Sequence, residues 1–199
     1  MTWRLSDAGT EACATDATGG AGLRAGRDAG AKSSEPRYDK GVPDADLIAA
    51  VRTAVPEGLR LDRTECDCDA DVAFCRQIPG QLIGADLDAL EREIGPDALE
   101  DCLQASRGAK IVLDDREWRV PTIRPRMRDG RCVFLGDDAR CRVHAIAPFG
   151  CAYFDAHMSR EISDARAWWG IAAIVADPRY LTWHARLKAL RGEVDPLAR

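Results

Sequence analysis

The chain has 199 residues, of which 28 are basic and 33 acidic, and its formal net charge is −5. A hydrophobic share of 46% is enough for a core and excludes a chain that is disordered throughout. No apolar run approaches about 18 residues, which excludes a membrane-spanning helix, and the acidic balance argues against general nucleic-acid binding. Residues 1–30 contain no continuous apolar stretch of the kind found in secretory signals, which predicts a cytoplasmic location.

Residues 1–41 differ in composition from the rest of the chain. They contain seven glycines and no valine, isoleucine or phenylalanine. Such a segment buries too little apolar surface to offset the chain entropy lost on folding. We therefore predict a flexible low-complexity tail over residues 1–41, with Cys13 as a free thiol, and a folded domain over residues 42–199.

Hydrophobic periodicity predicts five helices. The first is capped by Asp44 or Asp46 and ends at Pro56. The polar chain that follows it is expected to be irregular. The other four helices are predicted over residues 85–94, 97–106, 163–176 and 179–191.

Short segments with the composition of strands lie between the third and fourth helices. They cover residues 111–113, 118–123, 132–135 and 142–143. The order of elements predicts an α+β fold, a helix-rich single domain with a small central sheet. Three tryptophans on the last two helices could form a surface for a protein partner, but packing onto the sheet explains them more simply: Trp168, Trp169 and Trp183.

The positions of the eight cysteines are the most informative feature. Six of them occupy two short segments, residues 66–75 and 132–151, while Cys13 and Cys102 stand apart. Scattered small hydrophobic residues would not gather in this way. In a reducing cytoplasm, such grouping indicates metal ligation or redox chemistry rather than structural disulfides.

The chemistry of thiolates limits the metal. Thiolates are soft ligands that select Zn²⁺, Cu(I) or iron–sulfur clusters over Mg²⁺ or Ca²⁺. The single residue between Cys66 and Cys68 is too few for a zinc knuckle, and the spacing of Cys132, Cys141 and Cys151 matches no ferredoxin. The spacing therefore predicts a metal site and leaves the identity of the metal open.

Three motifs in the second group resemble a known family. They read Cys132-Val-Phe-Leu, Cys141-Arg-Val-His and Pro148-Phe-Gly-Cys-Ala-Tyr-Phe. This series resembles the second half of the YkgJ-type cysteine-cluster family, a zinc- or iron-chelating domain also found in flagellin lysine-N-methylases. The resemblance covers residues 66–155 and implies a bound zinc or iron, the iron either as an ion or in an iron–sulfur cluster.

The first half of that family carries a C-x₂-C-x₂-C-C run followed by a proline and a helix. The stretch from Cys75 to Pro79 is similar to the end of this run, and Cys68 falls on its first cysteine. The second and third family cysteines fall on Asp71 and Phe74. Asp71 can still ligate through oxygen, whereas Phe74 cannot, so this chain departs from the family where the family's ligands are densest.

The residue types and the motifs give a ranked set of metal ligands. Four cysteines form the central thiolate set, Cys68 comes next and Cys66 is the sixth: Cys66, Cys68, Cys75, Cys132, Cys141 and Cys151. Participation by Asp71, His144 or His157 stays open, since a lone histidine more often has a structural role. Cys102 follows Leu99 by three residues on an apolar helical face, which favours a buried core thiol.

These observations predict a cytoplasmic metal-binding protein with a zinc or iron centre. One alternative is an enzyme, either an iron–sulfur redox protein or a relative of protein-modifying methyltransferases. The sequence contains no glycine motif for S-adenosylmethionine that would support the methyltransferase version. Another alternative is a metal-responsive module in which thiol oxidation releases the ion.

Overall fold

A computed structural model describes residues 45–64, 66, 68–113 and 115–190. The predicted tail over residues 1–41, including Cys13, lies outside the described residues. The description contains seven α-helices and one short 3₁₀-helix. Their bounds are α1 Ala45–Ala54, α2 Asp69–Gln77, α3 Gly84–Ile94, α4 Pro96–Cys102, the 3₁₀-helix η1 His144–Ile146, α5 Phe149–Ala152, α6 Arg160–Val175 and α7 Pro178–Leu190.

The strands form three antiparallel pairs in place of the one small sheet that the sequence predicts. β1 pairs with β4, β2 with β3, and β5 with β6. The described part of the chain is thus helix-rich and α+β, as predicted. The strand bounds are β1 Leu103–Ala105, β2 Ala109–Leu113, β3 Arg116–Val120, β4 Ile123–Pro125, β5 Met127–Arg128 and β6 Arg131–Cys132.

Proline explains why the predicted strand over residues 118–123 is two strands. Pro121 lies between β3 and β4 and has no N–H with which to continue the β2–β3 ladder. After this break the chain changes partner, and Ile123 pairs with Ala105 of β1. The helix predicted over residues 97–106 ends at Cys102, because residues 103–105 form β1 and pair with β4.

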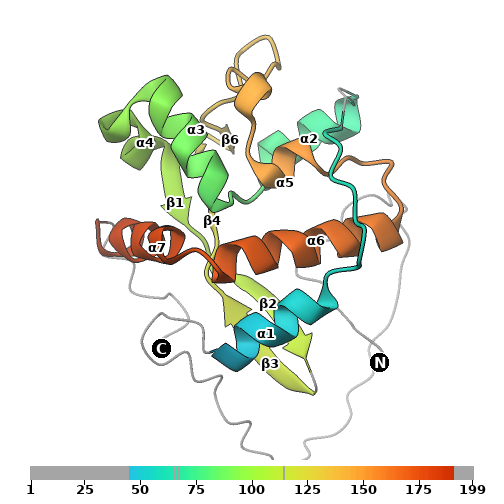
Figure 1. Cartoon of the computed structure of the whole chain (residues 1–199). Coiled ribbons are helices and arrows are strands. Elements are labelled where there is room, and N and C mark those ends of the chain that lie inside the picture. The colour runs from blue at the N-terminus through green and yellow to red at the C-terminus, as the bar shows by residue number, and fades with distance from the viewer. Residues whose placement is uncertain (1–44, 65, 67, 114, 191–199) are drawn as a thin grey trace, which may run out of the picture.

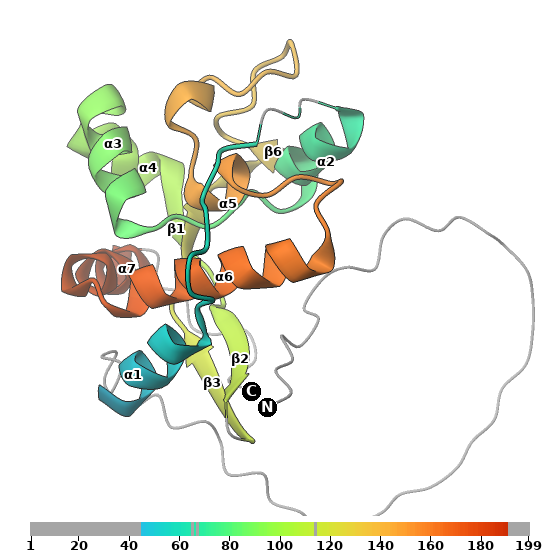
Figure 2. The ribbon, with the colours of Figure 1, turned by 45° about the vertical axis from the view of Figure 1, so that its right-hand side comes forward.

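The helix α6 crosses the middle of the molecule. The helix α1 and the β2–β3 hairpin lie on one side of it, and α2, α3, α4, α5 and β6 lie on the other (Figures 1 and 2). Trp168, Ile171 and Ile174 of α6 are buried in the core. The predicted packing of Trp168 is therefore confirmed, while Trp169 is partly buried and its ring lies against that of Phe149, with centroids 5.2 Å apart.

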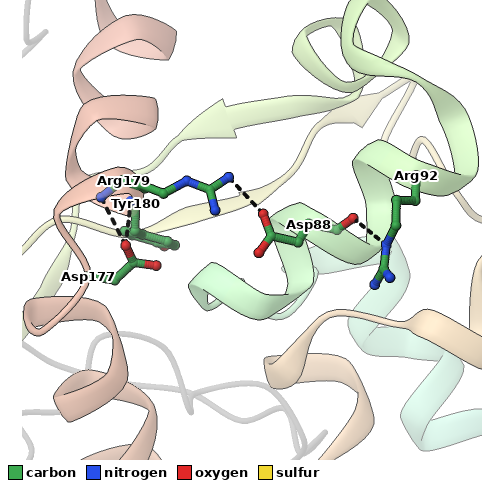
Figure 3. A network of polar contacts seen from close by, with 5 residues as sticks. All are labelled: Asp88, Arg92, Asp177, Arg179 and Tyr180. Atoms are coloured by element: carbon green, nitrogen blue, oxygen red, sulfur yellow. Dashed lines mark hydrogen bonds and ion pairs between the residues drawn. The ribbon is translucent and has the colours of Figure 1, made fainter.

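The helices α3 and α7 are joined by polar contacts around the start of α7. Asp177 caps α7, because its Oδ1 accepts hydrogen bonds from the N–H groups of Arg179 and Tyr180. The Arg179 guanidinium also reaches Asp88 of α3, with Nη2 to Oδ1 at 2.8 Å (Figure 3). Arg92 bonds to the Asp88 carbonyl one helical turn further on. The ion pair between Arg179 and Asp88 thus connects the start of α7 to the middle of α3.

A partly buried carboxylate ties the start of α3 to α5. The Oδ2 atom of Asp86 accepts hydrogen bonds from the N–H groups of Ile83, at 2.8 Å, and Phe149, at 2.7 Å. Burial raises the pKa of Asp86 to about 6, although both N–H groups and the charge of Arg63 act in the opposite direction. A carboxyl group with a raised pKa stabilises the folded state most at low pH, and this contribution is lost as the pH rises through about 6.

The raised pKa of Asp86 leads to a pH-dependent prediction for Asp86→Asn, which keeps an acceptor oxygen but cannot ionise. The stability advantage of the wild type over Asp86→Asn should fall by up to about 3 kcal/mol between pH 4 and pH 7. Urea unfolding of both proteins across that range measures the difference. The control is Asp88→Asn, which removes the exposed ion pair with Arg179. It leaves the hydrogen bonds of the Ile83 and Phe149 N–H groups to Asp86 intact. A difference between wild type and Asp86→Asn that does not change with pH would contradict the assignment.

Candidate metal centre

The fold brings the two cysteine segments together. Cys75 lies in α2, Cys132 in β6 and Cys151 in α5, and Cys141 forms an isolated antiparallel bridge with Leu135. The helix α2 packs directly against β6, and α5 lies next to both (Figures 1 and 2). Residues more than fifty positions apart in the sequence thus line one region of the molecule.

The prediction of irregular chain around the first cysteine group is wrong for Cys75. Residues 69–77 form α2, which begins after Cys68 and carries Asp69 and Asp71 in its first turn. Acidic residues there favour a helix because they interact with its positive N-terminal end. Val72 and Cys75 lie on the same face and pack against the core. None of the α2 residues is fully buried, so the period of the apolar side chains is a weak signal here.

Four of the thiols lie close enough for their charges to interact. Burial is the main cause that raises the pKa of Cys151, and the charges of Cys75, Cys132 and Cys141 raise it further. Burial likewise raises the pKa of Cys132 to about 11, with added contributions from Cys75 and Cys141. The pKa values of Cys75 and Cys141 are also raised, again chiefly by burial. We refer to Cys75, Cys132, Cys141 and Cys151 as the four-thiol set.

Backbone N–H groups lower the pKa of three thiols of the four-thiol set, and one of these groups donates a hydrogen bond to a sulfur. The N–H of Gly80 donates to Cys151 Sγ at 3.2 Å. The N–H groups of Phe134 and Leu135 lower the pKa of Cys132, and that of Val143 lowers the pKa of Cys141. The hydrogen bond of the Leu135 N–H itself goes to the Cys132 carbonyl, at 3.0 Å. An N–H group lowers the pKa of a thiol because it stabilises the thiolate more than the neutral thiol.

Two glycines bring the Gly80 donor within reach of Cys151. A Cβ on Gly80 would lie 2.1 Å from the carbonyl carbon of Gly150 and 2.4 Å from the nitrogen of Cys151. The N–H of Gly150 in turn bonds to the Gln81 carbonyl at 2.8 Å. The segment after α2 and the start of α5 therefore touch through their main chains, which no residue with a side chain would permit.

Cys66 and Cys68 gather around a histidine rather than around the four-thiol set. Among the described residues, Cys66, Cys68 and His157 form the one group of three whose ligand atoms all lie within 4.8 Å of one another. Cys68 Sγ and His157 Nε2 are 3.4 Å apart. The pKa of Cys66 is raised to about 11, mainly because Asp71 accepts a hydrogen bond from its thiol.

Other candidate residues from the sequence lie elsewhere. His144 is exposed in η1, and its carbonyl accepts a hydrogen bond from Arg63. Phe74 is 52% exposed. Cys102 lies at the end of α4 and packs against the core, but it is partly rather than fully buried. Burial is the main cause that raises its pKa.

Comparison of the chain with models of protein families, with curated proteins and with solved structures finds no match. No helix among the described residues has the length and apolar character needed to cross a membrane. The candidate metal centre therefore depends on the geometry of this chain alone.

Proposed function

We propose that the protein binds a zinc- or iron-based metal centre through Cys75, Cys132, Cys141 and Cys151. The observation that carries the proposal is the meeting of four thiols from remote segments, close enough for their charges to interact, with the Gly80 N–H donating a hydrogen bond to the Cys151 sulfur. A neutral thiol is a weak hydrogen-bond acceptor, whereas a metal-bound thiolate is charged and accepts strongly. Such donors are a regular feature of metal–thiolate sites, where they orient the ligands and tune the metal.

The proximity of the four thiols supports the same proposal. Cys132 is buried and the other three are partly buried, and burial raises the pKa of all four, so they are neutral thiols unless a cation is bound. Four thiolates this close together would repel one another without a cation, so the N–H donors alone do not stabilise them. A cation at the centre of the four-thiol set would offset that repulsion, and metal binding would release the thiol protons.

A zinc ion and an iron–sulfur cluster are the two versions of this centre, and they hold their sulfurs at different separations. A tetrahedral zinc ion with Zn–S bonds of about 2.3 Å places its sulfurs roughly 4 Å apart. No three members of the four-thiol set have sulfurs that all lie within 4.8 Å of one another. In a cluster the thiolates bind separate iron atoms and stand further apart. A cluster would supply electron transfer. If the protein is an enzyme, an iron–sulfur redox protein is therefore favoured over a relative of methyltransferases.

The resemblance to the YkgJ-type family is consistent with this proposal, because three of the four-thiol set are the cysteines of its second-half motifs. The proposal extends to location as well. Every described cysteine is a free thiol, which fits a reducing compartment such as the cytoplasm.

The test is metal analysis of protein purified without oxygen. We expect coloured protein that contains iron and acid-labile sulfide and that loses its colour on reduction. Cys132→Ser and Cys151→Ser should each lose most of the metal, while the control Cys102→Ser should keep it. Colourless protein with one bound zinc would favour the zinc version. Full metal content in a Cys132→Ser/Cys151→Ser double variant would contradict the proposal.

A further inference from the structure

We propose that Cys66, Cys68 and His157 form a second metal site that takes a single Zn²⁺ ion and leaves its fourth position open to solvent. The three ligand atoms lie within 4.8 Å of one another. Two thiolates and one imidazole are a common zinc ligand set, and three protein ligands with one open position are typical of reactive zinc sites.

The site joins two remote parts of the chain. Cys68 is the N-cap residue of α2, and His157 lies in the loop between α5 and α6, which passes beside that end of α2 (Figures 1 and 2). Cys68 Sγ and His157 Nε2 are 3.4 Å apart although the residues are 89 positions apart in the sequence. A contact of this kind needs a loop that is held in place.

Asp71 holds that loop. Its Oδ1 accepts a hydrogen bond from the Ala156 N–H at 2.7 Å, next to His157. Its Oδ2 faces the Cys68 thiol, which donates to it at 3.8 Å. The His157 N–H is bonded in turn to Asp155 Oδ1 at 2.8 Å. Asp71 is thus a positioning residue, since it connects the first turn of α2 to the histidine loop and lies beside the ligands.

Geometry separates this site from the four-thiol set. Cys68 and Cys75 lie at opposite ends of α2, seven residues apart, which corresponds to about 10 Å along the helix axis. One tetrahedral ion spans roughly 4 Å between sulfurs and cannot bind both. The ligand types also differ, because an iron–sulfur cluster uses mostly thiolates, whereas Cys66, Cys68 and His157 include an imidazole.

Exposure defines the open position. His157 is exposed, and Cys66 and Cys68 are partly exposed. A water molecule can therefore reach an ion bound by these three residues. The class of ligand that the site would take is a small donor that replaces this water, such as a thiol, an imidazole or a carboxylate.

The test is a titration of the full chain with Co²⁺, a coloured substitute for Zn²⁺, and with Zn²⁺ in competition with a chelator. His157→Ala should lose one equivalent of Co²⁺ and the thiolate-to-cobalt absorbance that accompanies it. The control is His144→Ala, which removes another exposed histidine and should change nothing. Asp71→Asn should weaken binding by roughly 10–100-fold while the cobalt spectrum is retained, as expected of a positioning residue.

The two metal sites can fail independently. The Cys132→Ser/Cys151→Ser double variant should keep the Co²⁺ equivalent that depends on His157, and His157→Ala should keep the iron or zinc of the four-thiol set. Equal Co²⁺ binding by His157→Ala and His144→Ala would overturn the second site. Loss of both centres in Cys68→Ser would also overturn it, because the two sites would then be one.

Discussion

Removal of the metal should unfold the segments that carry the four-thiol set and leave the α6 side of the molecule folded. A structural zinc ion contributes on the order of 10–16 kcal/mol of apparent binding free energy at neutral pH. A whole domain is stable by only about 5–15 kcal/mol. The helix α2 buries no residue completely, and the element it contacts most is β6, which carries Cys132.

Hydrogen exchange measures this effect by segment. After anaerobic chelation we expect amide protection to fall over residues 68–80 and 131–156. Protection should persist in α6 and in the β2–β3 hairpin, whose core residues include Ile111, Val120 and Ile174. The melting temperature should fall with it. The control is the Cys132→Ser/Cys151→Ser/His157→Ala variant, which lacks both proposed sites and in which the chelator should have no further effect. A wild type with unchanged protection and melting temperature after loss of its metal would refute a structural role.

Gly80→Ala should have the second-largest effect, because its methyl group would strike main chain rather than a side chain that can move aside. The added carbon would lie 2.1 Å from the carbonyl carbon of Gly150. Overpacking commonly costs about 1–3 kcal/mol, and we expect about 3 kcal/mol or more where two main chains must separate. The separation also takes the Gly80 N–H away from Cys151 Sγ, so the metal content should fall as well.

The matched control for Gly80→Ala is Gly58→Ala. Gly58 has φ +73° and no atom within 4 Å of an added Cβ, so alanine there suffers backbone strain alone, about 1–2 kcal/mol. Urea unfolding and metal analysis of both variants separate the two causes. Gly58→Ala should lose a little stability and no metal. If Gly80→Ala retained its metal and lost no more stability than Gly58→Ala, the glycine contact would not matter for the centre.

The sequence predicts the helices whose buried apolar residues recur at helical spacing. Leu47 and Val51 are spaced by four residues and both are buried in α1, and α3, α6 and α7 lie close to their predicted positions. The strands are less predictable because their ends depend on partners. Residues 133–135 and 142–143 have the composition of strands, yet most of them form turns around the short β5–β6 pair.

Some features of the candidate site can likewise be predicted from the sequence, and others depend on contacts that only the folded chain makes. Clustering alone singles out the six cysteines, and the structure brings Cys75, Cys132, Cys141 and Cys151 together, although their binding of a metal stays a prediction. The sequence does not show that Cys66 and Cys68 approach His157, because this approach depends on the Asp71 contact with Ala156. Nor does it show the role of Gly80, which follows from a contact with a second glycine seventy residues away.

The packing of Phe149 has a mechanical consequence. This ring precedes Cys151 by two residues and lies so close to Gly170 that a Cβ there would be 2.5 Å from its Cε1 atom. Gly170 belongs to α6, and α1 packs against that same helix. The Phe149 ring thus ties the start of α5, which carries Cys151, to the central helix. A side chain larger than hydrogen at position 170 would have to displace this ring.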